Sequence, residues 1–222
     1  MKIKKYVSII LLVPFLAIVL VYHIAIAGSV DKTMVKVPGG EFKSGHGGHD
    51  LHVKKVKKTF YIDKYEVTNV QFKKFQKEWT VPKGKENAPV VEVSYMEAED
   101  YCKSVGKRMP TAEEWEKAAR GTDRRVYPWG NDFDPKRANT LESRKRGTTT
   151  VGSYPDGKSP YGALDMSGNV WEWVDGWSSE EQQYRLVMGG SFFDNKTKAT
   201  TFSTLRSIED DIHTYIGFRC AK

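Results

Sequence analysis

The sequence predicts an α+β domain in which much of the chain lies outside regular elements. Three segments begin with a helix-capping motif, five short segments are typical of strands, and one long stretch is rich in turn-forming residues. The sequence shows no internal repeat and no low-complexity tract. At 222 residues the chain is long enough for one domain with a sizeable core.

Three helices are expected to start at the same local motif, a serine or threonine followed three residues later by Glu or Gln. In this capping box two side chains satisfy helix N–H groups that otherwise lack a partner. The motifs are Thr68–Gln71, Ser94–Glu97 and Thr111–Glu114, and the helices are expected to run to about Trp79, Val105 and Arg120. Gly106 and Gly121 are placed to end the second and third helices in the left-handed conformation. Phe72, Phe75 and Trp79 give the first helix an apolar stripe.

The short strands are expected at Met34–Val37, Glu41–Lys43, Val56–Tyr65, Arg185–Met188 and Tyr215–Arg219. The stretch from about residue 122 to 170 is rich in Gly, Pro, Asn, Asp and Thr, which predicts turns. Loops of this length in a domain are usually functional or tied down by something. A bound metal ion is one way to tie such a loop down.

The first 27 residues differ from the rest and predict export. Lys2, Lys4 and Lys5 precede an uncharged apolar run over 6–27, which ends in a small-x-small pattern. These parts are typical of a secretory signal peptide. Because about 20 apolar residues can span a bilayer, a retained N-terminal membrane anchor is the alternative. Both interpretations place the domain, residues 28–222, outside the cytoplasm, in the periplasm or at the cell surface.

The net charge gives little indication of a partner. Residues 1–27 carry three lysines and no acid, so the formal charge falls from +7 to +4 without them. The densest basic cluster, Lys54–Lys58, suits either an anionic surface or a strand with a solvated lysine face. No segment resembles a nucleic-acid-binding motif.

The chain has two cysteines, Cys102 and Cys220. In an exported domain two cysteines most simply form one disulfide. On chain-entropy grounds, closing a loop of this length contributes about 4–5 kcal/mol. Two free thiols, one of them reactive, are the alternative.

Eight short phrases follow one another between residues 34 and 222. They are Val37–Phe42 (VPGGEF), Tyr65–Asn69 (YEVTN), Pro89–Ser94 (PVVEVS), Gly106–Glu116 (GKRMPTAEEWE), Tyr127–Gly130 (YPWG), Gly168–Trp173 (GNVWEW), Gly189–Ser191 (GGS) and Gly217–Cys220 (GFRC). In this order they strongly resemble the formylglycine-generating enzyme (sulfatase-modifying factor) family. The resemblance implies a C-type-lectin-like α+β domain, often calcium-bound, in which Cys102 is disulfide-bonded to Cys220.

The resemblance also implies a structural calcium site, because the tryptophan phrase matches the family's ligand loop. Its ligands would be the carboxylates of Asp165 and Glu172 and the carbonyls of Gly168 and Val170. Calcium takes several oxygen ligands at irregular geometry, which a short loop can supply. Spacing alone favours the alternative, in which Asp165 and Glu172 cap turns while Trp171 and Trp173 fill the core, and the resemblance favours calcium. A second family site would use Asn139 and the carbonyl of Thr140, but the loop around 142–147 is shortened here.

The family's reactive thiols are missing from this chain. Sulfatase-activating members oxidise a substrate cysteine with oxygen, through two copper-binding thiols placed three and eight residues after the Gly-Gly-Ser serine. Counted from Ser191, those positions hold Asp194 and Ala199. Soft thiolates select Cu(I), whereas carboxylate is a hard ligand and a methyl group is none. We therefore expect neither copper binding nor formylglycine generation.

Two functions of different classes remain. The first is an exported, non-catalytic module that binds a protein, glycan or metabolite partner or assists a neighbouring maturation enzyme. The second is a cysteine-independent oxidoreductase acting on a secreted protein or metabolite, with Ser191, Asp194, Asn195 and Arg219 as candidate site residues. In the second, Asp194 would be a general base. The structural alternative is that Asp194 caps a turn and Arg219 pairs with a buried carboxylate.

His46, His49 and His52 form one further group of potential ligands. Imidazoles at three-residue spacing can bind Zn, Cu or Fe. The glycines between them favour a solvated loop before a strand, and His213 is given no role.

Overall fold

The computed structural model describes residues 33–45, 52–179 and 181–222. The predicted signal or anchor segment lies outside the described residues, and so do His46 and His49 of the histidine group. Over the described ranges, no helix is long and apolar enough to cross a membrane. Export stays a prediction, because residues 1–27 are not among the described residues.

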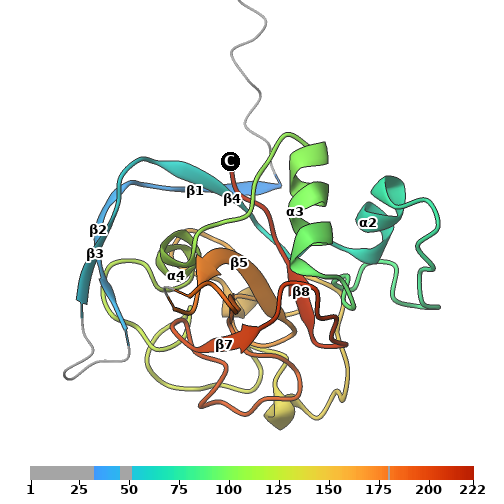
Figure 1. Cartoon of the computed structure of the whole chain (residues 1–222). Helices are drawn as coiled ribbons and strands as arrows, with labels where there is room; N and C mark the ends of the chain where they lie inside the picture. Colours follow the sequence, from blue (N-terminus) through green and yellow to red (C-terminus); the bar gives the residue numbers. More distant parts are fainter. Residues whose placement is uncertain (1–32, 46–51, 180) are drawn as a thin grey trace, which may run out of the picture. The chain divides into compact units, whose positions relative to one another are not determined.

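The predicted α+β class is confirmed, with short elements joined by long irregular segments (Figure 1). The helices are α2 (Asn69–Phe75), α3 (Tyr95–Ser104) and α4 (Ala112–Arg120). The strands are β1 (Met34–Val37), β2 (Gly40–Ser44), β3 (His52–Val56), β4 (Phe60–Asp63), β5 (Trp171–Trp177), β6 (Arg185–Met188), β7 (Thr204–Ser207) and β8 (Ile216–Phe218). Between residues 122 and 170 regular structure is limited to two short 3-10 turns, η2 (Leu141–Ser143) and η3 (Pro155–Gly157), as the composition predicts.

All three helices begin at the predicted capping boxes, with both reciprocal hydrogen bonds present. The predicted end of α2 is wrong, because Gln76 turns to an extended conformation. Trp79 instead folds back against Phe72, with ring centroids 5.1 Å apart. The other two helices end as expected at Gly106 and Gly121, whose φ angles of 70° and 73° suit glycine.

The strands form three separate sheets. β1 pairs with β4 and β2 pairs with β3, both antiparallel. The third sheet has the order β7-β6-β5-β8, and only β5 and β8 run parallel. The single strand expected over 56–65 is wrong, because residues 57–59 turn the chain from β3 to β4 and the two strands join different sheets.

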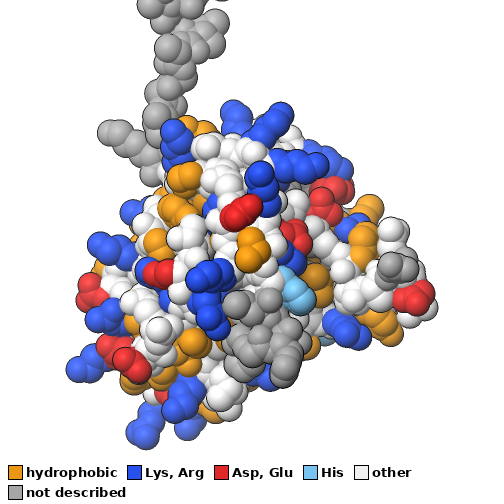
Figure 2. Space-filling view, turned by 90° about the vertical axis from the view of Figure 1, so that its left-hand side faces the viewer, with side chains coloured by type: hydrophobic (Ala, Val, Ile, Leu, Met, Phe, Trp, Pro, Cys, Tyr) orange, Lys and Arg blue, Asp and Glu red, His pale blue; other side chains and the backbone are white. Residues whose placement is uncertain are grey.

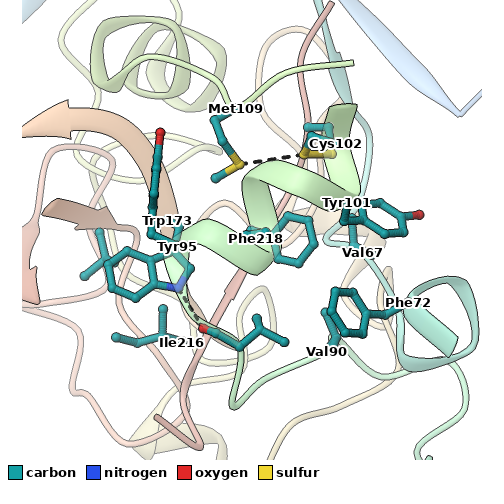
Figure 3. Packing of buried hydrophobic residues seen from close by; sticks show 14 of the residues in the cluster. Val67, Phe72, Val90, Tyr95, Tyr101, Cys102, Met109, Trp173, Ile216 and Phe218 are labelled. Carbon is teal, nitrogen blue, oxygen red and sulfur yellow. Dashed lines mark hydrogen bonds between the residues drawn. A yellow bond between two sulfur atoms is a disulfide. The ribbon is translucent and has the colours of Figure 1, made fainter. Parts of the chain in front are cut away.

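Two clusters of buried apolar side chains pack around the third sheet. The first lies between α3 and the β5–β8 part of the sheet, and the second lies under α4. Figure 3 shows the first cluster, where Trp173 from β5 points its ring at Tyr95 and donates its indole N–H to the carbonyl of Val93 at 3.0 Å. Aromatic side chains therefore satisfy their polar atoms while filling the core.

The predicted disulfide is confirmed. Cys102 of α3 is bonded to Cys220, two residues from the C-terminus and 118 residues along the chain. Both sulfurs are buried beside Met109 (Figure 3). The next two residues, Ala221 and Lys222, exchange backbone hydrogen bonds with Arg108 and Tyr61. The disulfide therefore ties α3 to a segment that is also paired with β4.

The basic cluster lies on β3 and the turn that follows it. Lys54 forms an ion pair with Glu113 at 2.9 Å, and Lys55 lies opposite Glu41 in the β2–β3 pair. Figure 2 shows blue Lys and Arg side chains scattered over this side of the molecule with red carboxylates among them. The cluster therefore fits a strand with a solvated lysine face. His52, the described member of the histidine group, is exposed at the start of β3.

Replacing both Cys102 and Cys220 by alanine is expected to lower the free energy of unfolding by about 4 kcal/mol, because the disulfide closes a long loop in the unfolded chain. Urea unfolding of both proteins, with and without reductant, measures the effect. Reductant should weaken the natural protein and leave the double variant unchanged. Equal stability of the two proteins under oxidising conditions would contradict the structural role.

Candidate functional site

The site is built around a buried ion pair between Arg219 and Glu172. Both side chains have 0% exposure. Nε and Nη2 of Arg219 each donate to a Glu172 carboxylate oxygen at 2.7 Å. Burial alone would lower the pKa of Arg219, but the adjoining carboxylate of Glu172 raises this pKa above its ordinary value. Arg219 is therefore a permanent cation inside the domain.

Further hydrogen bonds connect this ion pair to three other segments. The indole N–H of Trp115, in α4, donates to Glu172 at 2.7 Å. Arg219 also donates to the backbone carbonyls of Asp63, the last residue of β4, and of Lys64. It donates as well to the carbonyl of Leu164 in the long irregular stretch. A buried guanidinium needs this number of acceptors to offset its lost hydration. The ion pair therefore fixes the relative positions of β4, α4, β5, β8 and residues around 164.

Two further buried carboxyl groups adjoin the ion pair. Asp165 accepts a hydrogen bond from the backbone N–H of Gly152, and Asn169 donates to Oε1 of Glu66 at 2.8 Å. Burial raises the pKa of Asp165 to about 6, and burial together with Asp165 raises the pKa of Glu66 well above its usual range. Oε2 of Glu66 has no hydrogen-bond partner among the described residues. Two such carboxyl groups require a shared proton or a cation between them.

The predicted calcium ligands are therefore not equivalent. Asp165 faces Glu66, whereas both carboxylate oxygens of Glu172 already accept bonds from Arg219. A calcium ion bound here would have to compete with Arg219 for Glu172, while the unpartnered oxygen of Glu66 is suited to a cation. No group of three or more His, Cys, Asp or Glu side chains in the described ranges is arranged as a metal cluster. Calcium stays a prediction.

The remaining predicted ligands hold the irregular stretch together. Gly168 lies so close to Asn139 that a Cβ atom would come within 2.4 Å of its carbonyl oxygen. Val170 is buried beside it. The Asn139 amide donates to Gly147 and Asn169 and its oxygen accepts from Ser143. Thr140 donates its hydroxyl to Glu142 at 2.8 Å, and its carbonyl accepts from the N–H of Ser143 at 2.9 Å. The second calcium site also stays a prediction.

Asp194, at the first missing-thiol position, holds the turn that follows Gly-Gly-Ser. Its Oδ2 atom accepts from the backbone N–H of Ser191 at 3.0 Å and from the Ser191 hydroxyl at 2.6 Å. The same atom accepts from the indole N–H of Trp171 at 2.8 Å. Asp194 therefore fixes both the turn and the orientation of Trp171, as the turn-capping interpretation predicts.

Ala199, at the second missing-thiol position, is wholly buried. The backbone of Gly190 packs against it, and a Cβ atom on Gly190 would come within 2.8 Å of the Ala199 Cα. Gly190 has a φ of 77°, which favours glycine. The Ala199 methyl group is therefore part of the packed core.

A cleft of about 200 Å³ opens beside this turn. Its lining combines aromatic, apolar and polar side chains: Trp171, Ser191, Phe193, Asp194, Lys198, Thr204, Leu205 and Tyr215. Phe193 is 59% exposed and meets Tyr215 edge-on, with ring centroids 6.0 Å apart. An exposed aromatic ring at the mouth of a cleft is suited to ligand contact.

Of the four candidates from the sequence, the structure brings Ser191 and Asp194 together in the cleft. Asn195 is exposed and caps the next turn through Thr197, and it is not part of the cleft lining. Arg219 is buried in its ion pair, as the structural alternative predicts, and is not accessible to a ligand. The aromatic and apolar lining was not predicted, although Phe193, two residues after the Gly-Gly-Ser phrase, was a usable signal.

Comparison with known proteins decides the family. A model described as the sulfatase-modifying factor enzyme 1-like domain matches residues 27–222. The chain belongs to this family. Inactive C-alpha-formylglycine-generating enzyme 2 of Bos taurus is 30% identical to it, over 85% of this chain and 87% of the relative. The formylglycine-generating enzyme of Thermomonospora curvata is 29% identical, over 86% of this chain and 94% of the relative.

Solved structures agree with the sulfatase-modifying-factor fold. PvdO from Pseudomonas aeruginosa superposes with a TM-score of 0.72 at 24% identity, covering 85% of this chain and 93% of PvdO. CarF superposes with a TM-score of 0.73 at 22% identity, covering 85% of this chain and 97% of CarF. At these identities the similarity establishes the fold alone.

Glu172→Gln is expected to destabilise this sulfatase-modifying-factor domain by about 3–5 kcal/mol, because it removes the carboxylate that is hydrogen-bonded to the buried Arg219 charge. Arg137→Ala is the matched control, since Arg137 forms an ion pair with Asp134 in which both side chains are 40% exposed, and its loss should cost less than about 1 kcal/mol. Urea unfolding of both variants measures the difference. Equal effects would contradict the central role of the ion pair.

Asp194→Ala is expected to cost about 1–3 kcal/mol of stability, because two N–H groups and a hydroxyl lose one shared acceptor. Asp194→Asn keeps an oxygen acceptor and should cost less. Lys196→Ala, at an exposed neighbouring position, is the control and should change little. Thermal unfolding ranks the three variants, and a neutral Asp194→Ala would remove the structural role of this carboxylate.

Proposed function

We propose that this chain is an exported, non-catalytic member of the sulfatase-modifying-factor family. It binds a partner through the cleft beside Ser191 and Asp194, and it serves as a binding or maturation-accessory module. The observation that carries the proposal is the bonding of Asp194, which occupies a reactive-thiol position and instead fixes the turn and Trp171. Export rests on the character of residues 1–27.

The absence of formylglycine generation is supported by chemistry and by the relatives. The chain has two cysteines, and both are consumed by the disulfide between Cys102 and Cys220. No thiol is left to bind Cu(I) or to exchange with a substrate cysteine. The bovine and murine relatives named inactive C-alpha-formylglycine-generating enzyme 2, at 30% and 29% identity, support the same conclusion.

A binding role is supported by the composition of the cleft. Phe193 and Tyr215 present aromatic surface, and Lys198 contributes a positive charge. Trp171 and Ser191 are buried parts of the lining, and the Ser191 hydroxyl already donates to Asp194. Apolar walls with a few fixed polar groups are typical of ligand-binding sites. A protein, a glycan or a metabolite partner fits this description.

The oxidoreductase alternative has less support. Oδ2 of the proposed base Asp194 already accepts three hydrogen bonds, and the proposed substrate-binding residue Arg219 is buried in an ion pair. A base committed to structural donors is poorly placed to take a substrate proton. We therefore rank binding above catalysis.

The full chain is expected to form no aldehyde when it is incubated in air, with added copper and a thiol reductant, with a peptide carrying the cysteine motif of sulfatases. Mass spectrometry of the peptide with aldehyde capture measures the product. The formylglycine-generating enzyme of Thermomonospora curvata is the positive control for the assay. Aldehyde formation by this chain above the copper-only blank would overturn the proposal.

A further inference from the structure

Strand β7 lies at the edge of the four-stranded sheet and borders the cleft. It pairs with β6 on one side, and the strand order places none of the described strands on its other side. Thr204, Leu205 and Arg206 are all exposed. An exposed strand edge of this kind offers unpaired backbone groups to another chain.

The register shows which backbone groups of β7 face outward. Gly189 donates its N–H to the carbonyl of Ser203 across the extension of the β6–β7 pair. Hydrogen-bonded pairs alternate along an antiparallel ladder, so Leu205 and Ser207 also face β6. The N–H and C=O groups of Thr204 and Arg206 therefore point away from the sheet, and no hydrogen bond joins them to another described segment.

The cleft lies directly beside this edge, since Thr204 and Leu205 are part of its lining. Leu205 is 37% exposed and Phe193 is 59% exposed, so apolar surface adjoins the unpaired backbone. Lys198 in the cleft and Arg206 on the strand are both exposed. Neither forms an ion pair with a described carboxylate, which leaves two positive charges available to an acidic ligand.

We propose that β7 accepts an extended peptide segment of a partner protein as a fifth strand. The backbone of the peptide would pair with Thr204 and Arg206, one apolar side chain would enter the cleft against Phe193, and acidic side chains would face Lys198 and Arg206. Main-chain pairing supplies affinity and the side-chain pocket supplies selectivity in this mode of recognition. The inference rests on the proposed binding function and names its partner class.

The test begins with a random peptide library selected against the purified full chain. The selected peptides are synthesised with a fluorescent label, and fluorescence anisotropy measures their affinity. Enriched peptides are expected to combine an apolar residue with Asp or Glu. Failure to enrich any peptide that binds the natural chain would overturn the inference.

Arg206→Pro tests the edge itself. Proline removes the outward N–H of Arg206, while the β6–β7 hydrogen bonds use other residues. Loss of one backbone hydrogen bond and of the adjoining charge should weaken peptide binding at least about tenfold. Arg206→Ala, which keeps the N–H, is the matched control and should retain more affinity than Arg206→Pro.

N-methylated peptides provide a measurement that does not depend on the folding of a variant. N-methylation at the residues that face β7 should abolish binding, whereas N-methylation at the alternate residues should not. Equal tolerance of methylation at both sets of positions would overturn strand addition.

Phe193→Ala separates this inference from the proposed function. One outcome is that Phe193→Ala weakens peptide binding, whereas Arg206→Pro and N-methylation of the peptide at either set of positions have no effect. This outcome would overturn strand addition and leave cleft binding intact. Selected peptides that bind Phe193→Ala and Arg206→Pro as well as the natural chain would overturn both.

Discussion

Arg219 and Glu172 carry opposite charges in a place that water does not reach, so each depends on the other. Breaking such a pair leaves one uncompensated charge in the core, which is among the costliest changes that a small domain can suffer. The remaining donors of Arg219 bind the carbonyls of Asp63, Lys64 and Leu164. Segments that are distant in sequence and poor in regular structure are thereby held in one arrangement, which positions β5 and the turns beside it.

The cleft depends on this framework through β5. Trp171 begins that strand, and its indole N–H reaches Asp194 in the turn after Gly-Gly-Ser. Where thiol-dependent members of the family place a reactive cysteine, this chain places a carboxylate whose oxygen fixes the turn. Neither carboxylate nor methyl can replace a thiolate as a ligand for Cu(I), which is why we propose a binding role in place of thiol–copper chemistry.

Local chemistry predicted part of the fold well. The capping boxes and the glycines after α3 and α4 are determined by neighbouring residues, so sequence alone located those helix ends. Strand β7 was missed because its four residues are mostly exposed and carry no apolar alternation. The break between β3 and β4 depends on pairing with different partners, and the early end of α2 depends on the packing of Trp79 against Phe72. Such long-range contacts leave no short-range signal.

In the candidate site, too, the sequence predicted some features and only the tertiary structure revealed others. Family spacing located Ser191, Asp194 and the disulfide between Cys102 and Cys220. It could not assign Arg219, because only the tertiary structure shows that this guanidinium faces Glu172 and not the cleft. The aromatic lining joins residues from β5, from the turn after Ser191 and from the approach to β8, which sequence separation conceals.

The family framework is proposed to persist in this chain without thiol–copper chemistry. Metal analysis of the full chain, after exposure to Cu(I) and removal of excess metal, tests this proposal. We expect no stoichiometric copper or iron in the protein, whether or not it holds calcium. One equivalent of tightly held copper or iron would show that redox-metal chemistry remains and would overturn the proposal.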